Sequence, residues 1–459
     1  QRVARASLRA RIRELRSHPA VVIWANGSDG LPPDPVLNDY RQILKAQHWQ
    51  NAVVDTVSHV NRSWNGLHMA GPYVWRPPYY WFSDKYGPAR GSSAEEGDNE
   101  TIPPLESVRK FIPADKLWPI NEHWYFHAGA NEGNNTLENI QRVIDKRYGP
   151  SHSSEEFTKK AQLAHYEDVR AQYETYATHW ANRKMMIHWM MNNPWPSFFG
   201  HLFDDYFKPG GGYFGAKKGL RPISVVWDYY ASGDRSKAKL YVVNQTPEAR
   251  KNLKVAVEFF NLDGTRKYFT EISAFSIGPN TSREAMAIPR IPNLDSTYLI
   301  RSVLLDPTSS TAGAGPSEDK VLAENVYWES TTDDDLGDAR NNDQFKTVLA
   351  KWADLSALNA MPASELHVSA HLSASNTGKQ VEITLANPGN HVAFFVRAEV
   401  TRGLDGEEVL PVTYDDNYIT VFPHETRTIQ ATFNSSAGEV SPAVRVEGYN
   451  VAKKVLLLR

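Results

Sequence analysis

The sequence predicts a multidomain protein, α/β in its first half and all-β in its second, on three observations. Strand-like and helix-like segments alternate through about residue 230, as they do where helices cover a parallel sheet. After about residue 232, short alternating strands are separated by turns rich in Asn, Asp and Gly, which is typical of β-sandwiches. The length of 459 residues also exceeds that of one ordinary domain.

The α/β part is predicted from apolar periodicity and from helix-boundary residues. Its expected elements are a helix over 1–18, a strand over 20–25, a helix over 34–49, a long helix with a polar face over 153–183 and a strand over 184–192. The strand over 20–25, "AVVIWA", is a continuous apolar run. Such a run is typical of a strand that is covered on both faces in a parallel sheet.

The all-β part is predicted from alternation of apolar and polar residues with a period of two. Strand signals fall over 238–246, 253–265, 296–305, 367–389 and 444–459. The acidic stretch "STTDDDLGD" (330–338) separates two groups of these strands. We therefore expect two β-sandwich domains.

Composition excludes several classes of protein. The net charge is −3 and the Lys and Arg residues are scattered, which is not the pattern of a nucleic-acid-binding protein. Because the chain has no cysteine, it has no disulfide, thiol nucleophile or Cys-ligated metal. No apolar run is long enough to span a membrane. His123 and His127 are four residues apart but lack the usual intervening Glu and a third ligand, so we predict no metal and no cofactor.

Asp29 is a candidate catalytic residue. The apolar run "VVIWA" stops on "NGSDG", so that a carboxylate follows closely after a predicted strand. In α/β barrels the catalytic groups sit where the strands end. An Asp beside Gly also caps turns very often, and the position alone leaves both roles open.

A second group of carboxylates lies within residues 87–111, at Glu95, Glu96, Asp98 and Glu100. Alone, such a cluster is most often a solvated face. Together, this cluster and Asp29 provide two carboxyl groups at the ends of different strands. A retaining glycosidase needs two such groups, a general acid that donates a proton and a nucleophile that attacks the sugar. The chain is also rich in aromatic residues, which wall many sugar pockets although most of them belong to cores.

Several stretches carry a family resemblance. They include "WANGSDGLPPDP" (24–35), "HMAGPYVWRPPYYWF" (68–82), "MMNNPWPS" (190–197) and "GYFGAKKGLRP" (212–222). These stretches resemble the exo-β-D-glucosaminidases of glycoside hydrolase family 2, which release glucosamine from the non-reducing end of chitosan oligomers. The resemblance covers nearly the whole chain. "GSD" stands where most of the wider family, including the β-mannosidases, has "GNE", which favours glucosamine over mannose.

The resemblance implies a fold for each part of the chain. Residues 1–230 would be the C-terminal portion of a catalytic (β/α)8 TIM barrel, from the fourth strand onward. Immunoglobulin-like β-sandwich domains would follow over 231–332 and 333–459. An N-terminal portion of the same enzyme, on a separate or cleaved chain, would complete the barrel and part of the pocket. The resemblance also implies a secreted, extracellular enzyme.

The resemblance further implies roles for individual residues. Asp29 stands in the segment of the general acid/base. Laying Gly91, Pro103 and Leu105 on the family pattern places Glu95 on the nucleophile, with Glu96 beside it. Substrate contacts are expected from Ser28, Tyr73, Asn193 and Trp195, with Trp195 stacked on the sugar. The expected substrate is a chitosan oligosaccharide.

Two other readings of the sequence stay open. The first is another specificity within family 2, such as a β-mannosidase or an endo-β-mannosidase. The second is a non-catalytic carbohydrate-binding protein, suggested by the aromatic residues and the two β-rich parts. The presence of both Asp29 and Glu95 favours an enzyme over a binding protein.

Overall fold

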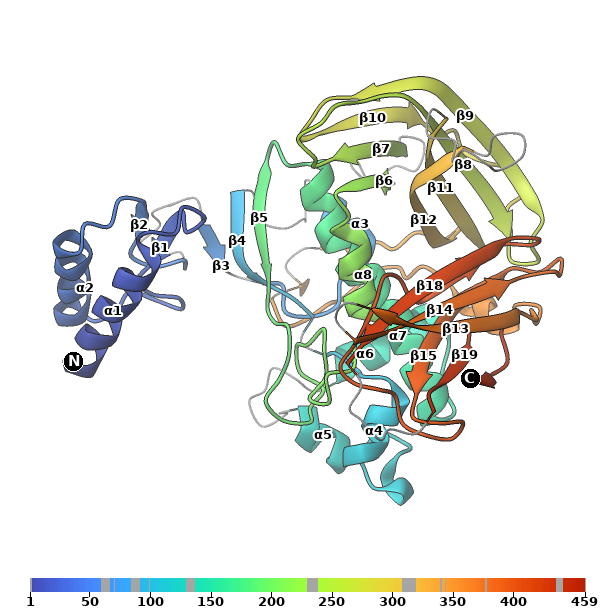
Figure 1. Ribbon diagram of the computed structural model, residues 1–459, viewed down its shortest axis with the longest axis horizontal. Coiled ribbons are helices and arrows are strands. Elements are labelled where there is room, and N and C mark those ends of the chain that lie inside the picture. Colours follow the sequence, from blue (N-terminus) through green and yellow to red (C-terminus); the bar gives the residue numbers. More distant parts are fainter. Residues whose placement is uncertain are drawn as a thin grey trace. The chain divides into compact units, whose positions relative to one another are not determined.

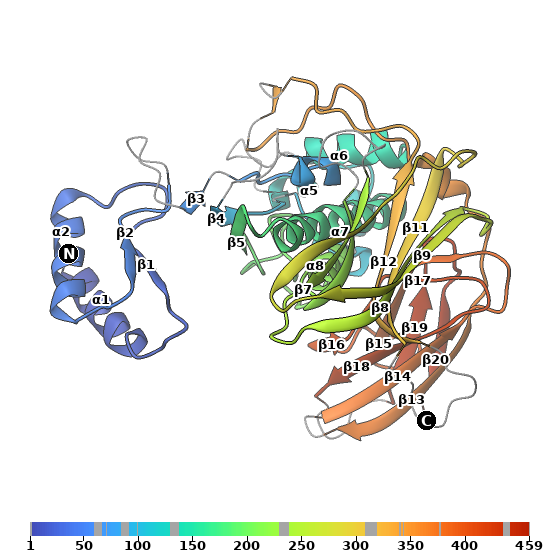
Figure 2. The same ribbon diagram turned by 90° about the horizontal axis from the view of Figure 1, so that it is seen from above.

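The computed structural model describes residues 2–58, 67–69, 71–83, 91–98, 100–128, 137–228, 238–307, 319–338, 341–342, 344–375, 378–434 and 441–458. The chain forms two compact units. Unit 1 comprises Gln1–Gly71, Pro88–Glu96 and Ala181–His188, and unit 2 comprises the rest. Figures 1 and 2 show the elements of both units in two views.

Unit 1 begins with two helices that alternate with two strands. They are α1 (Arg2–Leu15), β1 (Ile23–Ala25), α2 (Asp34–Ala46) and β2 (Ala52–Val54). β1 and β2 pair in parallel, with Ile23 opposite Ala52, and α2 is the crossover between them. Apolar side chains at helical spacing on α1 and α2 pack together, namely Leu8, Ile12, Ile43 and Leu44.

Unit 1 also holds a three-stranded parallel sheet. Its strands are β3 (Leu67–Met69), β4 (Gly91–Glu96) and β5 (Arg183–His188), in the order β3-β4-β5. Because the strands of a parallel sheet run in the same direction, the residues at their carboxyl ends gather at one edge. This edge receives Glu95 and Glu96 from β4 and His188 from β5, and Glu96 is the backbone partner of His188.

Unit 2 contains the remaining helices. They are α3 (Pro78–Phe82), α4 (Leu105–Phe111), η1 (Ala114–Lys116), α5 (Glu122–Ala128), α6 (Glu138–Val143), η3 (Ile144–Tyr148), α7 (Ser154–Thr178), α8 (Gly211–Gly219) and η6 (Ser356–Ala360). Ser153 caps α7, because its side chain accepts a hydrogen bond from the Glu156 amide. α7 and α8 lie side by side (Figure 2), and Gly211 allows this, since a Cβ there would lie 2.2 Å from the Gln162 carbonyl oxygen.

The predicted long helix with a polar face is α7, and most of this helix is buried. The polar side chains of α7 find partners inside the protein. His165 pairs with Asp98 at 2.6 Å, and the Glu167 carboxylate accepts hydrogen bonds from Arg147 and Tyr148. A polar helix therefore serves as a core element, because its charged groups are paired rather than solvated.

The first β-sandwich consists of antiparallel sheets in the orders β10-β7-β6 and β12-β11-β8-β9. Its strands are β6 (Ile223–Asp228), β7 (Lys239–Asn244), β8 (Arg250–Asn261), β9 (Arg266–Ile277), β10 (Thr281–Ala287), β11 (Thr297–Asp306) and β12 (Lys320–Ser330). β6 lies before residue 231 and pairs along its whole length with β7. The first sandwich therefore includes residues from Ile223 onward, whereas the predicted domain begins at residue 231.

The second β-sandwich has the sheet orders β13-β14-β18-β16 and β17-β15-β19-β20. Its strands are β13 (His367–Ser375), β14 (Gly378–Ala386), β15 (Ala393–Thr401), β16 (Val412–Tyr414), β17 (Ile419–Val421), β18 (Thr426–Phe433), β19 (Ala443–Glu447) and β20 (Lys454–Leu457). Every residue of β15 is buried, although the strand contains Arg397 and Glu399. Those two side chains bond to each other, which makes their burial tolerable.

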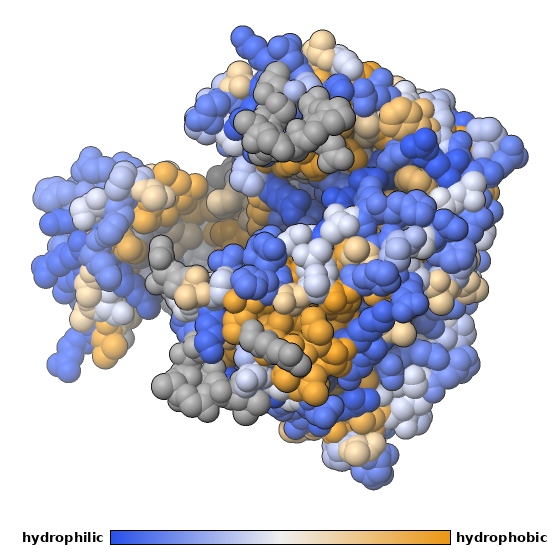
Figure 3. All heavy atoms as spheres, turned by 45° about the vertical axis from the view of Figure 1, so that its right-hand side comes forward, coloured by the Kyte–Doolittle hydropathy of each residue, from blue (hydrophilic) through white to orange (hydrophobic). Residues whose placement is uncertain are grey.

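The strand predicted over 20–25 is shorter and more exposed than expected. β1 covers only Ile23–Ala25, and Ile23 is 40% exposed while Val22 before it is 64% exposed. The residues that the structure describes therefore do not cover both faces of β1. Figure 3 shows hydrophobic residues at the surface among a mostly hydrophilic exterior. Among the described residues, no helix is both long and apolar enough to cross a membrane.

Candidate functional site

The turn that carries Asp29 is fixed by backbone contacts. Gly27 requires glycine, since a Cβ there would lie 2.5 Å from the Gly30 carbonyl oxygen. The Val57 amide donates to the Gly27 carbonyl at 3.1 Å, and the Thr56 hydroxyl donates to the Ser28 carbonyl at 2.9 Å. The segments that follow β1 and β2 are thus tied together, and Asp29 is exposed at their end.

Glu95 and Glu96 differ in accessibility. Successive residues of a strand point to opposite faces. Glu96 is fully buried, with 0% of its surface exposed, whereas Glu95 is half-buried. Of the two neighbours, Glu95 is therefore the one with a solvent-accessible side chain.

Ser28 brings the predicted acid and the predicted nucleophile into one neighbourhood. Its hydroxyl lies 3.2 Å from Glu95 Oε1 and 3.1 Å from the sulfur of Met69, and the carboxylate is the stronger acceptor. Asp29 is the next residue in the chain. The loop after β1 and the end of β4 therefore meet within unit 1.

We predict that Ser28→Ala lowers kcat/KM by about 10-fold for a reaction that uses the Glu95 carboxylate, because a hydrogen bond to a charged group contributes about 1.5 kcal/mol or more. Ser28→Thr keeps the hydroxyl and is expected to recover most of the activity. Ser7→Ala, on the exposed face of α1, is the control. Wild-type kcat/KM for Ser28→Ala would show that the contact with Glu95 has no catalytic role.

Asp55 is a polar strand-end residue that the sequence analysis did not single out. It follows β2 as Asp29 follows β1, and it accepts hydrogen bonds from Asn26 at 3.3 Å and from Arg41 Nε at 3.2 Å. The hydrogen bond from Arg41 lowers the pKa of Asp55 below its ordinary value. The sequence pattern that could have identified Asp55 is "NAVVDT", in which an apolar run also ends on an acidic residue. Its contacts indicate a role in joining the ends of β1 and β2.

The other predicted substrate contacts belong to unit 2. Tyr73 is only 7% exposed and its ring stacks on Phe345, with centroids 5.5 Å apart. Asn193 is buried, and its amide nitrogen donates to the Ser197 hydroxyl at 2.9 Å and to the Phe199 carbonyl. Both side chains are therefore engaged in local packing. Trp195, in contrast, is 40% exposed.

The segment that follows β4 is held by buried polar contacts inside unit 2. His165 Nε2 accepts a hydrogen bond from the Ile102 amide at 3.0 Å, so Nδ1 carries the proton that it donates to Asp98. Glu100 is fully buried and accepts a hydrogen bond from the Ile140 amide at 2.7 Å. Burial, together with the charge of Asp98, raises the pKa of Glu100 to about 8. Asp98 and Glu100 are thus structural residues in this arrangement.

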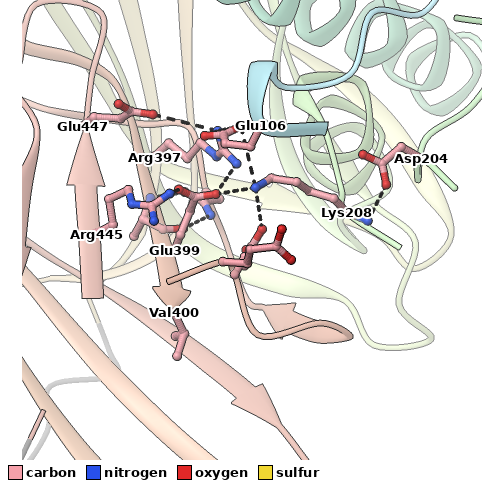
Figure 4. Close-up of polar contacts among 12 residues, drawn as sticks. Glu106, Asp204, Lys208, Arg397, Glu399, Val400, Arg445 and Glu447 are labelled. Atoms are coloured by element: carbon pink, nitrogen blue, oxygen red, sulfur yellow. Dashed lines mark hydrogen bonds and ion pairs between the residues drawn. The ribbon is translucent and has the colours of Figure 1, made fainter. Parts of the chain in front are cut away.

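One cluster of carboxylates has oxygens close enough together to be tested as a metal site. It contains Glu106, Glu399 and Glu447, with one ligand atom from each within 4.8 Å of the others. Figure 4 shows that basic side chains lie among them, and Lys208 Nζ is 2.7 Å from Glu399. Burial opposes ionisation of Glu106, but Arg397 and Lys208 nevertheless lower its pKa below the ordinary value. These carboxylates already have cationic partners, so the cluster is an ion-pair network.

Family models match both sandwich regions. Residues 344–451 match the Exo-beta-D-glucosaminidase Ig-fold domain, and residues 236–331 match the Mannosidase Ig/CBM-like domain. The immunoglobulin-like domains expected from the sequence are therefore confirmed.

Similar proteins match almost the entire chain. It is 34% identical to an exo-β-D-glucosaminidase of Streptomyces avermitilis, over 99% of this chain and 50% of that protein. It is 31% identical to an exo-β-D-glucosaminidase of Amycolatopsis orientalis, over 99% of this chain and 44% of that protein. The chain thus spans about half the length of these relatives.

Solved structures agree with the sequence comparison. The crystal structure of the Amycolatopsis orientalis exo-chitosanase CsxA matches 99% of this chain and 54% of its own, with a TM-score of 0.86 at 29% identity. Variants of CsxA with one glutamate or one aspartate replaced by alanine have been solved in complex with PNP-beta-D-glucosamine. Taken together, these similarities show that the chain is a homologue of the exo-β-D-glucosaminidases, as its sequence predicts.

Proposed function

We propose that the protein is a retaining glycoside hydrolase that releases β-linked D-glucosamine from the non-reducing end of chitosan oligosaccharides. The observation that carries the proposal is the contact between Ser28 and Glu95 at 3.2 Å, which joins the loop of Asp29 to the end of β4. Retaining glycosidases need two carboxyl groups from such neighbouring positions. The names of the relatives, and the aspartate and glutamate replaced in the CsxA complexes, support the same assignment.

The proposed reaction is a double displacement. Asp29, protonated, donates its proton to the glycosidic oxygen while Glu95 attacks the anomeric carbon, so that the leaving sugar departs and a glycosyl-enzyme ester forms. Asp29, now ionised, then takes a proton from water, and the water oxygen displaces Glu95. Glucosamine leaves with its original β configuration, and both carboxyl groups return to their starting states. The half-buried position of Glu95 fits a nucleophile that must be reached by the sugar.

A substrate panel tests this function against mannosidase activity, which the mannosidase-type model over 236–331 keeps open as a second candidate. The panel compares kcat/KM for p-nitrophenyl β-D-glucosaminide and β-D-mannoside, and it follows glucosamine release from chitosan oligomers. A clear preference for the glucosaminide supports the proposal. A preference for the mannoside supports the second candidate. Sugar binding without turnover of either would indicate a non-catalytic carbohydrate-binding protein.

We also propose that the parallel strands of unit 1 belong to a (β/α)8 barrel that another polypeptide segment completes. Parallel strands are normally covered on both faces. Here Val22, Ile23, Val53 and Ile187 are between 40% and 64% exposed. The segment that we propose to cover these strands is equivalent to the part of the relatives that this chain does not match. From the same relationship we also propose that the protein is secreted.

Size-exclusion chromatography of the active protein, followed by denaturing electrophoresis, tests the proposed occupant. We predict that active fractions contain a second fragment or a longer polypeptide, since the exposed apolar strands need a covering layer. A folded, active species that contains only the 51.8 kDa chain would contradict this proposal. That result would leave the assignment of Asp29 and Glu95 intact.

A further inference from the structure

A long irregular segment connects β5 to α8. Residues 189–210, all of which the structure describes, contain no helix or strand. Such a segment has no continuous ladder of backbone hydrogen bonds, so it keeps one conformation only where other contacts hold it. We define residues 199–208 as the anchor loop. The anchor loop makes such contacts on two sides.

On its first side, the anchor loop packs on residues that follow β5 and β4 in the chain. The amides of Leu202 and Phe203 donate to the Met191 carbonyl at 2.9 and 2.8 Å. The His201 amide donates to the Thr101 hydroxyl at 3.3 Å, and Thr101 belongs to the segment that follows β4. A displacement of the anchor loop would therefore also displace the segments that follow these two strands.

On its second side, Lys208 fastens the anchor loop to the second β-sandwich. Only 4% of Lys208 is exposed. Its Nζ lies 2.7 Å from Glu399 Oε1 on β15, 3.0 Å from Glu408 Oε2 and 3.7 Å from Glu106 Oε2 on α4. Figure 4 shows the side chain directed from the loop toward Glu399. Burial opposes protonation, but the three carboxylates nevertheless raise the pKa of Lys208 above its ordinary value. Its ammonium group therefore stays charged.

Asp204 joins the position of Lys208 to the rest of the anchor loop. Asp204 is buried, and its Oδ1 accepts hydrogen bonds from the amides of Tyr206 and Lys208, both at 2.9 Å. The Asp204 amide donates to the Lys208 carbonyl at 3.1 Å. These bonds close the turn that carries Lys208, so a shift of the lysine backbone also moves the residues before it.

The kind of contact that Lys208 makes suits positioning better than stability. A buried ion pair contributes little net stability, because taking charges out of water costs about as much as their attraction returns. Charge-assisted bonds are directional, however, and Lys208 Nζ must lie among its carboxylates for all of them to form. Enzymatic reactions are sensitive to such precision, since a displacement on the order of 1 Å can cost about 10²-fold in rate.

We propose that Lys208 is a positioning residue for the glycosidase reaction, through which the second β-sandwich holds the segments that follow β4 and β5 in their active arrangement. The effect on the reaction rests on the proposed function. The tie between the anchor loop and the sandwich rests on the contacts of Lys208 alone. Lys208 acts through the loop and not on the substrate, because its ammonium group is enclosed by carboxylates.

Steady-state kinetics test the effect on the reaction. Lys208→Met removes the charge and is expected to fold, since Glu399 still accepts hydrogen bonds from two arginine side chains. We expect its kcat/KM for an aryl β-glucosaminide to fall about 10²-fold. Lys208→Arg keeps the charge and is expected to recover most of the activity. Lys239→Met is the matched control, because it removes a more exposed ion pair, with Glu284 at 2.7 Å, and is expected to keep wild-type activity.

Hydrogen exchange measures the tie without using catalytic activity. The amides of Leu202, Phe203 and Lys208 are hydrogen-bonded, and we expect their exchange to accelerate about fivefold or more in Lys208→Met. Exchange in β8 and β11 is expected to stay at the wild-type rate, which separates local release of the loop from global unfolding. Lys208→Arg and Lys239→Met are expected to exchange as the wild-type protein does.

The two measurements together decide between the outcomes. Unchanged exchange of the anchor loop in Lys208→Met would overturn the proposal. Faster exchange with wild-type kcat/KM would overturn the positioning role, as would an equal loss of activity in Lys239→Met. A wild-type protein that cleaves no glucosaminide, while its Lys208→Met variant releases the loop, would refute the proposed function and keep the tie to the sandwich.

Discussion

Replacing Glu95 by glutamine is expected to abolish turnover of β-glucosaminides, with a fall in kcat on the order of 10⁵-fold or more, as for the loss of other enzymatic nucleophiles. Glutamine has nearly the same shape and can still accept the hydrogen bond from Ser28, but it cannot form the glycosyl ester. The measurement is steady-state hydrolysis of an aryl glucosaminide. A mechanism-based glycosyl fluoride with a slow second step would label the wild-type protein and leave Glu95→Gln unlabelled.

Glu96→Gln is the matched control for this prediction. Glu96 is the next residue of β4 and is fully buried, so a substrate cannot reach its carboxylate. We expect this variant to keep most of its activity, provided that thermal unfolding shows it to be folded. If the two substitutions exchanged their effects, the alignment that places Glu95 on the nucleophile would be out of register by one residue.

Asp29→Asn is expected to reduce activity in proportion to how poor the leaving group is. A general acid contributes about 10²- to 10⁴-fold, and this contribution matters most when the departing oxygen needs a proton. Hydrolysis of chitosan oligomers should therefore nearly stop. Formation of the glycosyl-enzyme from an activated aryl glycoside should survive much better, because that leaving group departs without protonation.

Pre-steady-state kinetics separate the two steps of this reaction. A burst of phenol release followed by slow turnover is expected for Asp29→Asn, since the second step lacks its base. Added azide, which needs no base, should restore turnover and yield the β-glycosyl azide. Equal losses in the first step for oligomers and for the aryl glycoside would show that Asp29 caps the turn after β1 without donating a proton.

Exposure is the property of the site that sequence reasoning could least predict. Tyr73, Asn193 and Trp195 were all expected to contact substrate, yet only Trp195 presents a large open surface, while Tyr73 and Asn193 are buried in local packing. The contact between Ser28 and Glu95 joins positions 67 residues apart in the chain, and no local sequence pattern records such a contact.

The sequence by itself determined the change from alternating helices and strands to β-sandwiches near residue 230, and the carboxylate Asp29 close after an apolar strand. These features depend on local periodicity and turn residues, which a sequence displays directly. The immunoglobulin-like type of the sandwiches and the choice of Glu95 within its cluster of carboxylates came from the family resemblance. Only the tertiary structure decided that Glu95 is more accessible than Glu96, that Ser28 bonds to Glu95, and that the polar side chains of α7 are buried in pairs. The physical reason is that burial and pairing depend on residues far apart in the chain, which are brought together only when the sheets and helices pack.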